Sequence, residues 1–377
     1  MADSPVPPPA AGNPAGPLRI GSVALPAPCA VAPMAGMTDS AFRRLVKRHG
    51  GCGLVVTEMV SSEGLVRGID RTLEYAEFTE EERPVSIQIF GGDPAKMAEA
   101  ARIVEGLGAD IVDVNMGCPV PKIAKHNAGC SLMREPAQAA AVIAAMSRSV
   151  RIPVTVKMRA GWNQNEINAP DLARRLEDAG AAAVAVHGRT AAQSYSGFSD
   201  WDLIARVAEE LTVPVFGSGD CVEPGQIVER LRASSVRGVL VGRGVLRNPW
   251  ILSQAADLAT GRTPRAVTRQ ERRRFLLQYI DLLLDEHLDE AEGFRHVAGR
   301  LPEGVMPGPA RGRERWVINK VRALGAWYTR GFEHGSRLRT AINGCESVGA
   351  LKDLVADFFE DGQQRLDPPA WEERGIA

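Results

Sequence analysis

A predicted strand and the turn that follows it read Asp110-Ile111-Val112-Asp113-Val114-Asn115-Met116-Gly117-Cys118-Pro119. The first half is rich in Val and Ile, which is typical of a buried parallel strand. Gly117 and Pro119 favour a tight turn, and Asn115 adds a hydrogen-bonding amide. Barrels of α/β type hold their catalytic groups directly after such strands. Cys118 is therefore either a catalytic thiol or a buried cysteine in a turn.

The same order of strand, turn and helix recurs eight times. Strand-like runs begin near Cys29, Leu54, Val85, Asp110, Val154, Ala182, Val213 and Gly238. Helical patterns follow them, for example over 39–49, 94–107 and 171–179. Repeated βα units imply a parallel sheet covered by helices, and eight units ending near Thr260 predict a (β/α)8 TIM barrel, an α/β fold. A doubly wound open sheet is the alternative.

The chain changes character after the eighth unit. Apolar residues then recur at helical spacing, as in Phe275, Leu276 and Tyr279 or Val317 and Val321. We predict three segments: a Pro-, Ala- and Gly-rich disordered tail over 1–18, a catalytic barrel over 19–263, and a small all-α helical domain over 264–377.

Composition narrows the class of protein. The 377 residues carry a net charge of −1, so any nucleic-acid site must be local. The six cysteines form no Cys-x-x-Cys pair, which favours free thiols in a reducing cytoplasm. The start resembles no signal peptide, and no apolar run is long enough to span a membrane. Neither carboxylates nor histidines cluster as metal ligands do, so we expect no metal.

Polar residues stand at the predicted strand ends, where a barrel would bring them together. Gly219, Gly242 and Arg243 end the last two strands, a common place for a phosphate held by backbone amides and a cation. Lys157 follows an apolar run and would need a partner when buried. A flavin supplies one, since its electron-rich edge attracts Lys and its amide edge matches Gln88. His187 ends another predicted strand, so we expect its side chain at the same mouth of the barrel.

Six motifs together resemble the signature set of the tRNA-dihydrouridine synthases, most similar to the bacterial B-type subgroup. They are Ala32-Pro33-Met34-Ala35-Gly36-Met37-Thr38-Asp39, Gln88-Ile89-Phe90-Gly91, Asn115-Met116-Gly117-Cys118-Pro119, Lys157-Met158-Arg159, His187-Gly188-Arg189-Thr190 and Gly242-Arg243-Gly244-Val245-Leu246-Arg247-Asn248-Pro249-Trp250. The resemblance covers about residues 19–345. It implies an FMN-bearing barrel and a helical tRNA-binding domain, which together reduce D-loop uridines with electrons from NADPH.

The resemblance also implies site residues. Cys118 would be the general acid, and Asn115 and Arg189 would hold the uracil. The residues expected to bind FMN are Pro33, Met34, Gln88, Lys157, His187, Ser218, Gly219, Asp220, Gly242 and Arg243. Ser218 and Cys130 depart from the family pattern, which commonly has Asn and Ser at these positions.

The chemistry implied is the reduction of the uracil 5,6 double bond. Hydride would pass from FMN N5 to uracil C6, and Cys118 would protonate C5. The base must leave its stack to enter the barrel, which costs a few kcal/mol, so binding of the remaining tRNA must compensate.

A basic segment of the helical domain could supply that binding. Arg311, Arg313, Arg315, Lys320 and Arg322 alternate with Trp316, Trp327 and Tyr328, and Arg330, Arg337 and Arg339 follow. Cations can follow phosphates and aromatic rings can stack on bases. The alternative is a solvated helix with aromatic core residues. We expect the tRNA-bound protein to be a monomer.

Two other functions remain open at this point. An FMN barrel that reduces a small molecule would share Lys157 and the phosphate site, but would not explain the helical domain. A non-catalytic RNA-binding protein on a barrel scaffold would retain no flavin and would be colourless.

Overall fold

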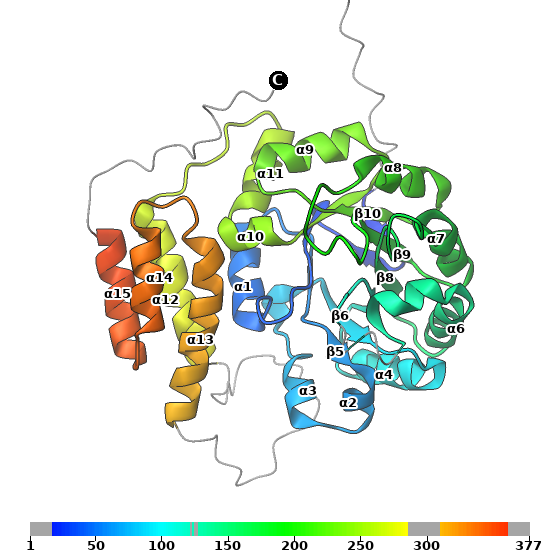
Figure 1. Cartoon of the computed structure of the whole chain (residues 1–377), viewed down its shortest axis with the longest axis horizontal. Coiled ribbons are helices and arrows are strands. Elements are labelled where there is room, and N and C mark those ends of the chain that lie inside the picture. Colours follow the sequence, from blue (N-terminus) through cyan, green and yellow to red (C-terminus); the bar gives the residue numbers. More distant parts are fainter. Residues whose placement is uncertain (1–16, 121–122, 124–126, 286–309, 361–377) are drawn as a thin grey trace, which may run out of the picture.

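The structure, a computed structural model, describes residues 17–120, 123, 127–285 and 310–360. Figure 1 shows a barrel with an outer ring of helices and a separate group of helices packed against one side. The predicted tail over 1–18 lies outside the described residues except for its last two positions. The same holds for 286–309 and 361–377 within the predicted helical domain.

The barrel of the described chain is built from eight parallel strands. They are β3 Cys29–Val31, β4 Leu54–Val56, β6 Val85–Phe90, β7 Ile111–Met116, β8 Val154–Arg159, β9 Ala183–His187, β10 Val215–Ser218 and β11 Gly238–Val241. Each pairs in parallel with its neighbours, and the pairings of β3 with β11 and of β4 with β6 close the ring. The TIM barrel prediction is therefore confirmed, and the open-sheet alternative is wrong.

Helices follow the strands as predicted. The longer ones on the barrel are α1 Ser40–His49, α4 Pro94–Gly106, α6 Pro136–Ser147, α7 Ala169–Asp178, α8 Trp201–Glu210, α9 Pro224–Ala233 and α11 Ile251–Ala259. Several begin at an Asp whose side chain accepts a backbone N–H of the first turn, as Asp39 does from Phe42 and Asp200 from Leu203. Shorter elements lie in the connections: β5 Val60–Ser61, α2 Ser62–Val66, α3 Asp70–Glu74 and α10 Arg243–Arg247.

The barrel interior changes from apolar to polar along the strands. At its base, the hairpin of β1 Arg19–Ile20 and β2 Val23–Ala24 adds apolar side chains to a cluster that includes Ile111, Phe216 and Leu240. Toward the carboxyl ends of the strands, inward positions become polar, as at Gln88 and Asn115. Because side chains alternate along a strand, these polar groups lie above the apolar plug and face the barrel mouth.

The C-terminal helices share a core with the barrel. They are α12 Arg269–Asp285, α13 Ala310–Tyr328, α14 Gly335–Asn343 and α15 Val348–Glu360. Phe42 of α1 meets Phe275 and Tyr279 of α12 edge to face, with ring centroids 6.1 and 6.4 Å apart. The fold prediction of a barrel followed by a helical region is confirmed, whereas the boundary at 263/264 stays a prediction.

Candidate active site

Strand register brings the predicted polar residues to one end of the barrel. Asn115 of β7 pairs with Lys157 of β8, and His187 of β9 pairs with Ser218 of β10. Gln88 of β6 lies in register with Asp113 of β7. These pairs line the inside of the barrel near the carboxyl ends of the strands, the position that barrel enzymes use for chemistry.

The turn after β7 presents Cys118 to the barrel mouth. The Asn115 side-chain oxygen accepts hydrogen bonds from the backbone N–H groups of Gly117 and Cys118, at 3.1 and 2.9 Å. Of the six cysteines, all within the described residues, the other five are buried and only Cys118 is partly exposed. The turn therefore holds a reachable thiol, unlike the buried cysteine of the alternative interpretation.

Asp113, which no sequence motif singled out, orients the amides beside this turn. Its carboxylate accepts hydrogen bonds from Gln88 Nε2 and Thr155 Oγ1, both at 2.6 Å. Gln88 Oε1 must then face Asn115, whose Nδ2 donates to it at 2.7 Å. Burial raises the pKa of Asp113, although these hydrogen bonds and Lys157 oppose the shift. The sequence does contain a sign of this role, because Asp113 is a carboxylate within an otherwise apolar strand, two residues before Asn115.

Lys157 of β8 stands at the barrel mouth with its ammonium free to bind a ligand. Its ammonium forms no hydrogen bond or ion pair with any residue in the described ranges. Burial, reinforced by the neighbouring Arg159, lowers its pKa to about 8, while Asp113 and Cys118 act against the shift. A largely enclosed ammonium without an acceptor fits a site for an electron-rich ring such as a flavin, whose N1 and O2 edge would accept from it.

The predicted phosphate turns lie beside this lysine site. Gly219 has a φ of +124°, and a Cβ built there would lie 2.5 Å from the Cβ of Ser199, so only glycine fits. A Cβ on Gly242 would lie 3.5 Å from Met34 Sδ, which places the strand-1 loop next to the second glycine turn. Arg243 lies over the Tyr195 ring at 5.0 Å and is one-third exposed, so its guanidinium is accessible to an anion.

Ser218 and Asp220 are placed in this region but mainly bind protein groups. Ser218 Oγ donates to the Leu240 carbonyl at 3.0 Å and so connects β10 with β11. Asp220 accepts from Arg189 Nη2 at 2.7 Å and from the Ser199 N–H at 2.6 Å. These contacts favour a role in shaping the phosphate turn. Direct binding of the cofactor by either residue stays a prediction.

His187 is neutral at physiological pH. Burial, followed by the positive charges of Lys157, Arg159, Arg189 and Arg243, lowers its pKa to about 2. Its Nε2 lies 3.3 Å from Arg189 Nη1, and a guanidinium can only donate. The ring therefore accepts at Nε2 and carries its proton on Nδ1.

Two buried arginines hold the loop between β9 and α8. Arg189 donates to the carbonyls of Ser196 at 3.1 Å and Gly197 at 2.6 Å, in addition to its pair with Asp220. Arg159 donates to the carbonyls of Gly117 and Thr190, at 2.7 and 2.9 Å, and thereby joins this loop to the Cys118 turn. The motif that contains Arg159 indicated no role for it. Uracil binding by Arg189 stays a prediction.

The cations of the helical region divide into two groups. Lys320, Arg313 and Arg322 bind groups of the protein: Arg322 donates to the carbonyls of Ile342, Asn343 and Cys345, and Arg313 donates to that of Leu283. The exposed ones include Arg315, Arg337 and Arg330, of which Arg330 also donates to the Ala326 carbonyl at 3.3 Å and lies over the Trp327 ring; the side chain of Arg311 lies outside the described residues. Tyr328 is fully buried and stacks on Phe275, so it belongs to the core.

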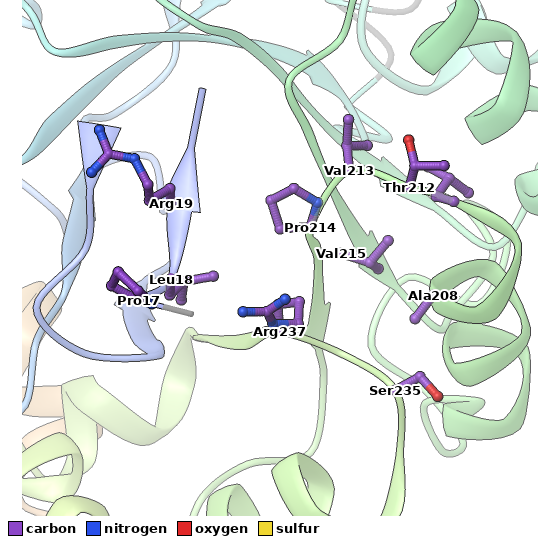
Figure 2. A pocket seen from close by; sticks show the side chains of 11 residues that line it. Pro17, Leu18, Arg19, Ala208, Thr212, Val213, Pro214, Val215, Ser235 and Arg237 are labelled. Carbon is purple, nitrogen blue, oxygen red and sulfur yellow. The ribbon is translucent and has the colours of Figure 1, made fainter. Parts of the chain in front are cut away.

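A cavity of about 350 Å³ lies away from this site. Figure 2 shows Leu18 and Arg19 on one side of it and Pro214, Val215 and Arg237 on the other. These residues stand at or before the starts of β1, β10 and β11, so the cavity lies at the base of the barrel, opposite the end that carries the candidate site.

The described residues contain neither a metal-ligand cluster nor a membrane-spanning helix. Among them, no group of three or more His, Cys, Asp or Glu side chains is arranged to hold a metal ion. Within the same ranges, no helix is both long and apolar enough to cross a membrane.

Comparison with known proteins identifies the family. Residues 30–305 match the family described as Dihydrouridine synthase (Dus). A "Probable tRNA-dihydrouridine synthase" of Rickettsia conorii is 35% identical over 344 residues, covering 91% of this chain and 96% of the relative. A "tRNA-dihydrouridine synthase B" of Xanthomonas campestris pv. campestris is 34% identical over 353 residues, covering 93% and 98%.

The fold also matches a solved structure, that of a histamine dehydrogenase from Rhizobium sp. 4-9. The TM-score is 0.50 at 13% identity, over 71% of this chain and 50% of that one, which concerns the fold alone. The family match places this closed barrel among the flavin-dependent oxidoreductases. The chain belongs to the tRNA-dihydrouridine synthase family, and the predicted B-type resemblance is confirmed.

Proposed function

We propose that this protein reduces uridine in the D-loop of tRNA to 5,6-dihydrouridine, with FMN as cofactor and NADPH as reductant. The observation that carries the proposal is the proximity of a partly exposed Cys118 to Lys157, which has no partner among the described residues, at the mouth of a barrel of this family. The printed names of the relatives supply the tRNA and the product.

The residues present suit a flavin mononucleotide. Lys157 would hold the electron-rich edge of the ring, and Gln88 keeps one amide N–H beyond its bond to Asp113 for the opposite edge. Pro33 and Met34 would cover a face of the ring. The turns at Gly219 and Gly242 would admit a phosphate to bare backbone amides, with Arg243 as its cation.

Bound reduced flavin supplies a hydride to one carbon of the uracil double bond. Cys118 donates the proton to the adjacent carbon, which carries the developing negative charge. The thiolate left on Cys118 interacts with the positive charges of Lys157 and Arg159.

Asn115 links acid and substrate. Its side-chain oxygen fixes the Cys118 turn, and its amide group has, beyond the bond to Gln88, a second N–H whose partner is the weakly accepting Met59 Sδ at 3.8 Å. We assign that N–H to a uracil carbonyl, where a donor stabilises the enolate-like charge. Because His187 is neutral, it would not stabilise this charge as a cation. We therefore assign its ring a contact with the cofactor.

The proposal is tested with purified protein and a tRNA transcript that carries no modifications. We expect yellow protein that releases FMN on denaturation, is bleached by NADPH, and adds two hydrogen atoms to one D-loop uridine, as read by mass spectrometry of nuclease fragments. Release of FAD, absence of flavin, or a transcript of unchanged mass would contradict it.

A further inference from the structure

Lys320, on a helix of the helical region, extends its side chain into the loops at the mouth of the barrel. Lys320 of α13 is 12% exposed, and its Nζ lies 3.2 Å from both Asp39 Oδ2 and Glu58 Oε1. The two carboxylates are 9% and 7% exposed. Burial alone would lower the pKa of Lys320, but the two acids outweigh it and raise the pKa. The ammonium is thus fixed as a cation away from solvent.

The two acids come from the loops that follow the first two barrel strands. Asp39 begins α1 through its bond from the Phe42 N–H at 2.9 Å, and it also accepts from Tyr279 Oη at 2.8 Å. Glu58 follows β4, and its second oxygen accepts from the Gly36 N–H. Lys320 itself lies 3.4 Å from the Gly36 carbonyl. Lys320 therefore contacts the Gly36 carbonyl directly and reaches the Gly36 N–H through Glu58, so both peptide groups of Gly36 in the loop over 33–38 are held.

That loop reaches the predicted cofactor site. Its strand is fixed by the Ala32 N–H to the Val241 carbonyl at 3.0 Å, and Met34 adjoins Gly242. Within the loop, the Met34 carbonyl accepts from the N–H groups of Met37 and Thr38, at 3.0 and 3.1 Å. The loop is consequently a compact turn held at one end by the barrel and at the other by Lys320.

A second path runs from Glu58 to the catalytic turn. The neighbouring Thr57 accepts from the Gln88 N–H at 3.1 Å, and Met59 Sδ lies 3.8 Å from Asn115 Nδ2. The segment over 57–59 therefore contacts the backbone of Gln88 and the side-chain amide of Asn115. A displacement of Glu58 would therefore move both the loop over 33–38 and the contacts of this segment with Gln88 and Asn115.

We propose that Lys320 is a positioning residue for the flavin site, so that the helical region completes a site begun by the barrel strands. This inference rests on the proposed function, because it takes the loop over 33–38 to line the flavin. It differs from the sequence-based expectation for Lys320, which was a contact with tRNA phosphate. The ammonium of Lys320 is already paired with two buried carboxylates. If it turned to a tRNA phosphate instead, both carboxylates would be left buried without a counter-ion, which is costly.

The test compares FMN-loaded Lys320→Met with wild type and with Lys352→Met. Lys352 of α15 forms an exposed ion pair with Asp281 of α12, so it controls for removal of a lysine ion pair elsewhere in the helical region. We expect Lys320→Met to release FMN about tenfold faster on dilution, the effect of removing one charge-assisted hydrogen bond, and to alter the flavin absorption bands. Lys320→Arg should recover part of the change, and Lys352→Met should show none.

Other outcomes separate the possibilities. A lower melting temperature with unchanged FMN release and spectrum would overturn the inference and leave Lys320 with a purely structural role. If Lys320→Met does not accumulate, Glu58→Gln takes its place, since it keeps the volume and weakens the same ion pair; wild-type FMN release in that variant would also overturn it. Wild-type protein without FMN would instead contradict the proposed function.

Discussion

Cys118 owes its position to two side chains that hold its turn. The Asn115 side-chain oxygen accepts from two consecutive N–H groups of the turn, and Arg159 donates to the Gly117 carbonyl at 2.7 Å. The thiol is therefore presented by a turn that is fixed through both its N–H groups and a carbonyl. The remaining cysteines are buried, and burial raises the pKa of Cys130 to about 11.

The first prediction concerns the proton donor. Cys118→Ala should bind FMN and accept electrons from NADPH, because neither step needs the acid, while tRNA reduction falls about 10²–10⁴-fold. Stopped-flow absorbance follows the flavin, and mass spectrometry follows the tRNA. Cys130→Ser is the control and should change little. Near-full tRNA reduction in Cys118→Ala, together with no reduction in Cys130→Ala, would show that the acid lies elsewhere.

The second prediction concerns Lys157 and pH. In flavin-free protein its pKa is about 8, below the ordinary 10.5, so the unfolded chain binds more protons between these values. The stability contribution of this group therefore rises as the pH increases through that window. FMN binding needs the protonated amine, so FMN affinity should fall by about tenfold per pH unit above about pH 8.

Fluorescence titration of flavin-free protein with FMN measures this dependence. Lys157→Met should bind FMN more weakly and show no such slope. Because a thiol also titrates near pH 8.5, Cys118→Ala is the matched control and should keep the slope. A slope that survives in Lys157→Met and disappears in Cys118→Ala would show that the thiol titrates, and not the amine.

At the scale of single elements, the strands were predictable and parts of the site were not. Each barrel strand is a short apolar run with turn residues after it, so its start could be placed within two residues. The helix α14 was missed, because its few buried residues, such as Leu338 and Ile342, give too short a pattern. The roles of Asp113 and Arg159 depend on neighbouring strands and loops, which no local pattern contains.

The third prediction concerns the loop between β9 and α8. Arg189→Lys removes the planar fork that serves two carbonyls and Asp220, and should destabilise the loop by about 1–3 kcal/mol. Amide hydrogen exchange over 194–199 should accelerate, and tRNA reduction should fall while flavin reduction by NADPH is retained. Arg134→Lys, at an exposed pair with Glu166, is the control and should change neither. Unchanged exchange with a raised KM for tRNA would point to direct uracil contact.

At the scale of the whole molecule, the helical region and the barrel pack against each other over a shared hydrophobic core. Aromatic packing joins α1 to α12, and Lys320 joins α13 to the barrel rim. The sequence predicted a helical domain with clustered cations, but it could not separate those that bind protein groups from those left exposed. That distinction depends on which residues lie across the junction, and these are more than two hundred positions apart in sequence.

The fourth prediction follows from that distinction. The double variant Arg315→Glu/Arg330→Glu should raise the KM for tRNA and flatten its salt dependence by about one unit of slope for each phosphate that is no longer neutralised. NADPH-driven flavin reduction should be unchanged. The control Arg206→Glu/Arg232→Glu reverses the same number of charges on α8 and α9. Equally weakened tRNA binding in both doubles would show a general charge effect, not a binding face.

The proposed function is tested most directly by one turnover without external reductant. Holoenzyme is reduced by NADPH, freed of excess nucleotide, and mixed anaerobically with an unmodified tRNA transcript while the flavin absorbance is recorded. We predict that the flavin is reoxidised and that one dihydrouridine forms for each flavin. A flavin that stays reduced with tRNA, yet is reoxidised by a small unsaturated carbonyl compound, would contradict a tRNA substrate and identify a small-molecule reductase.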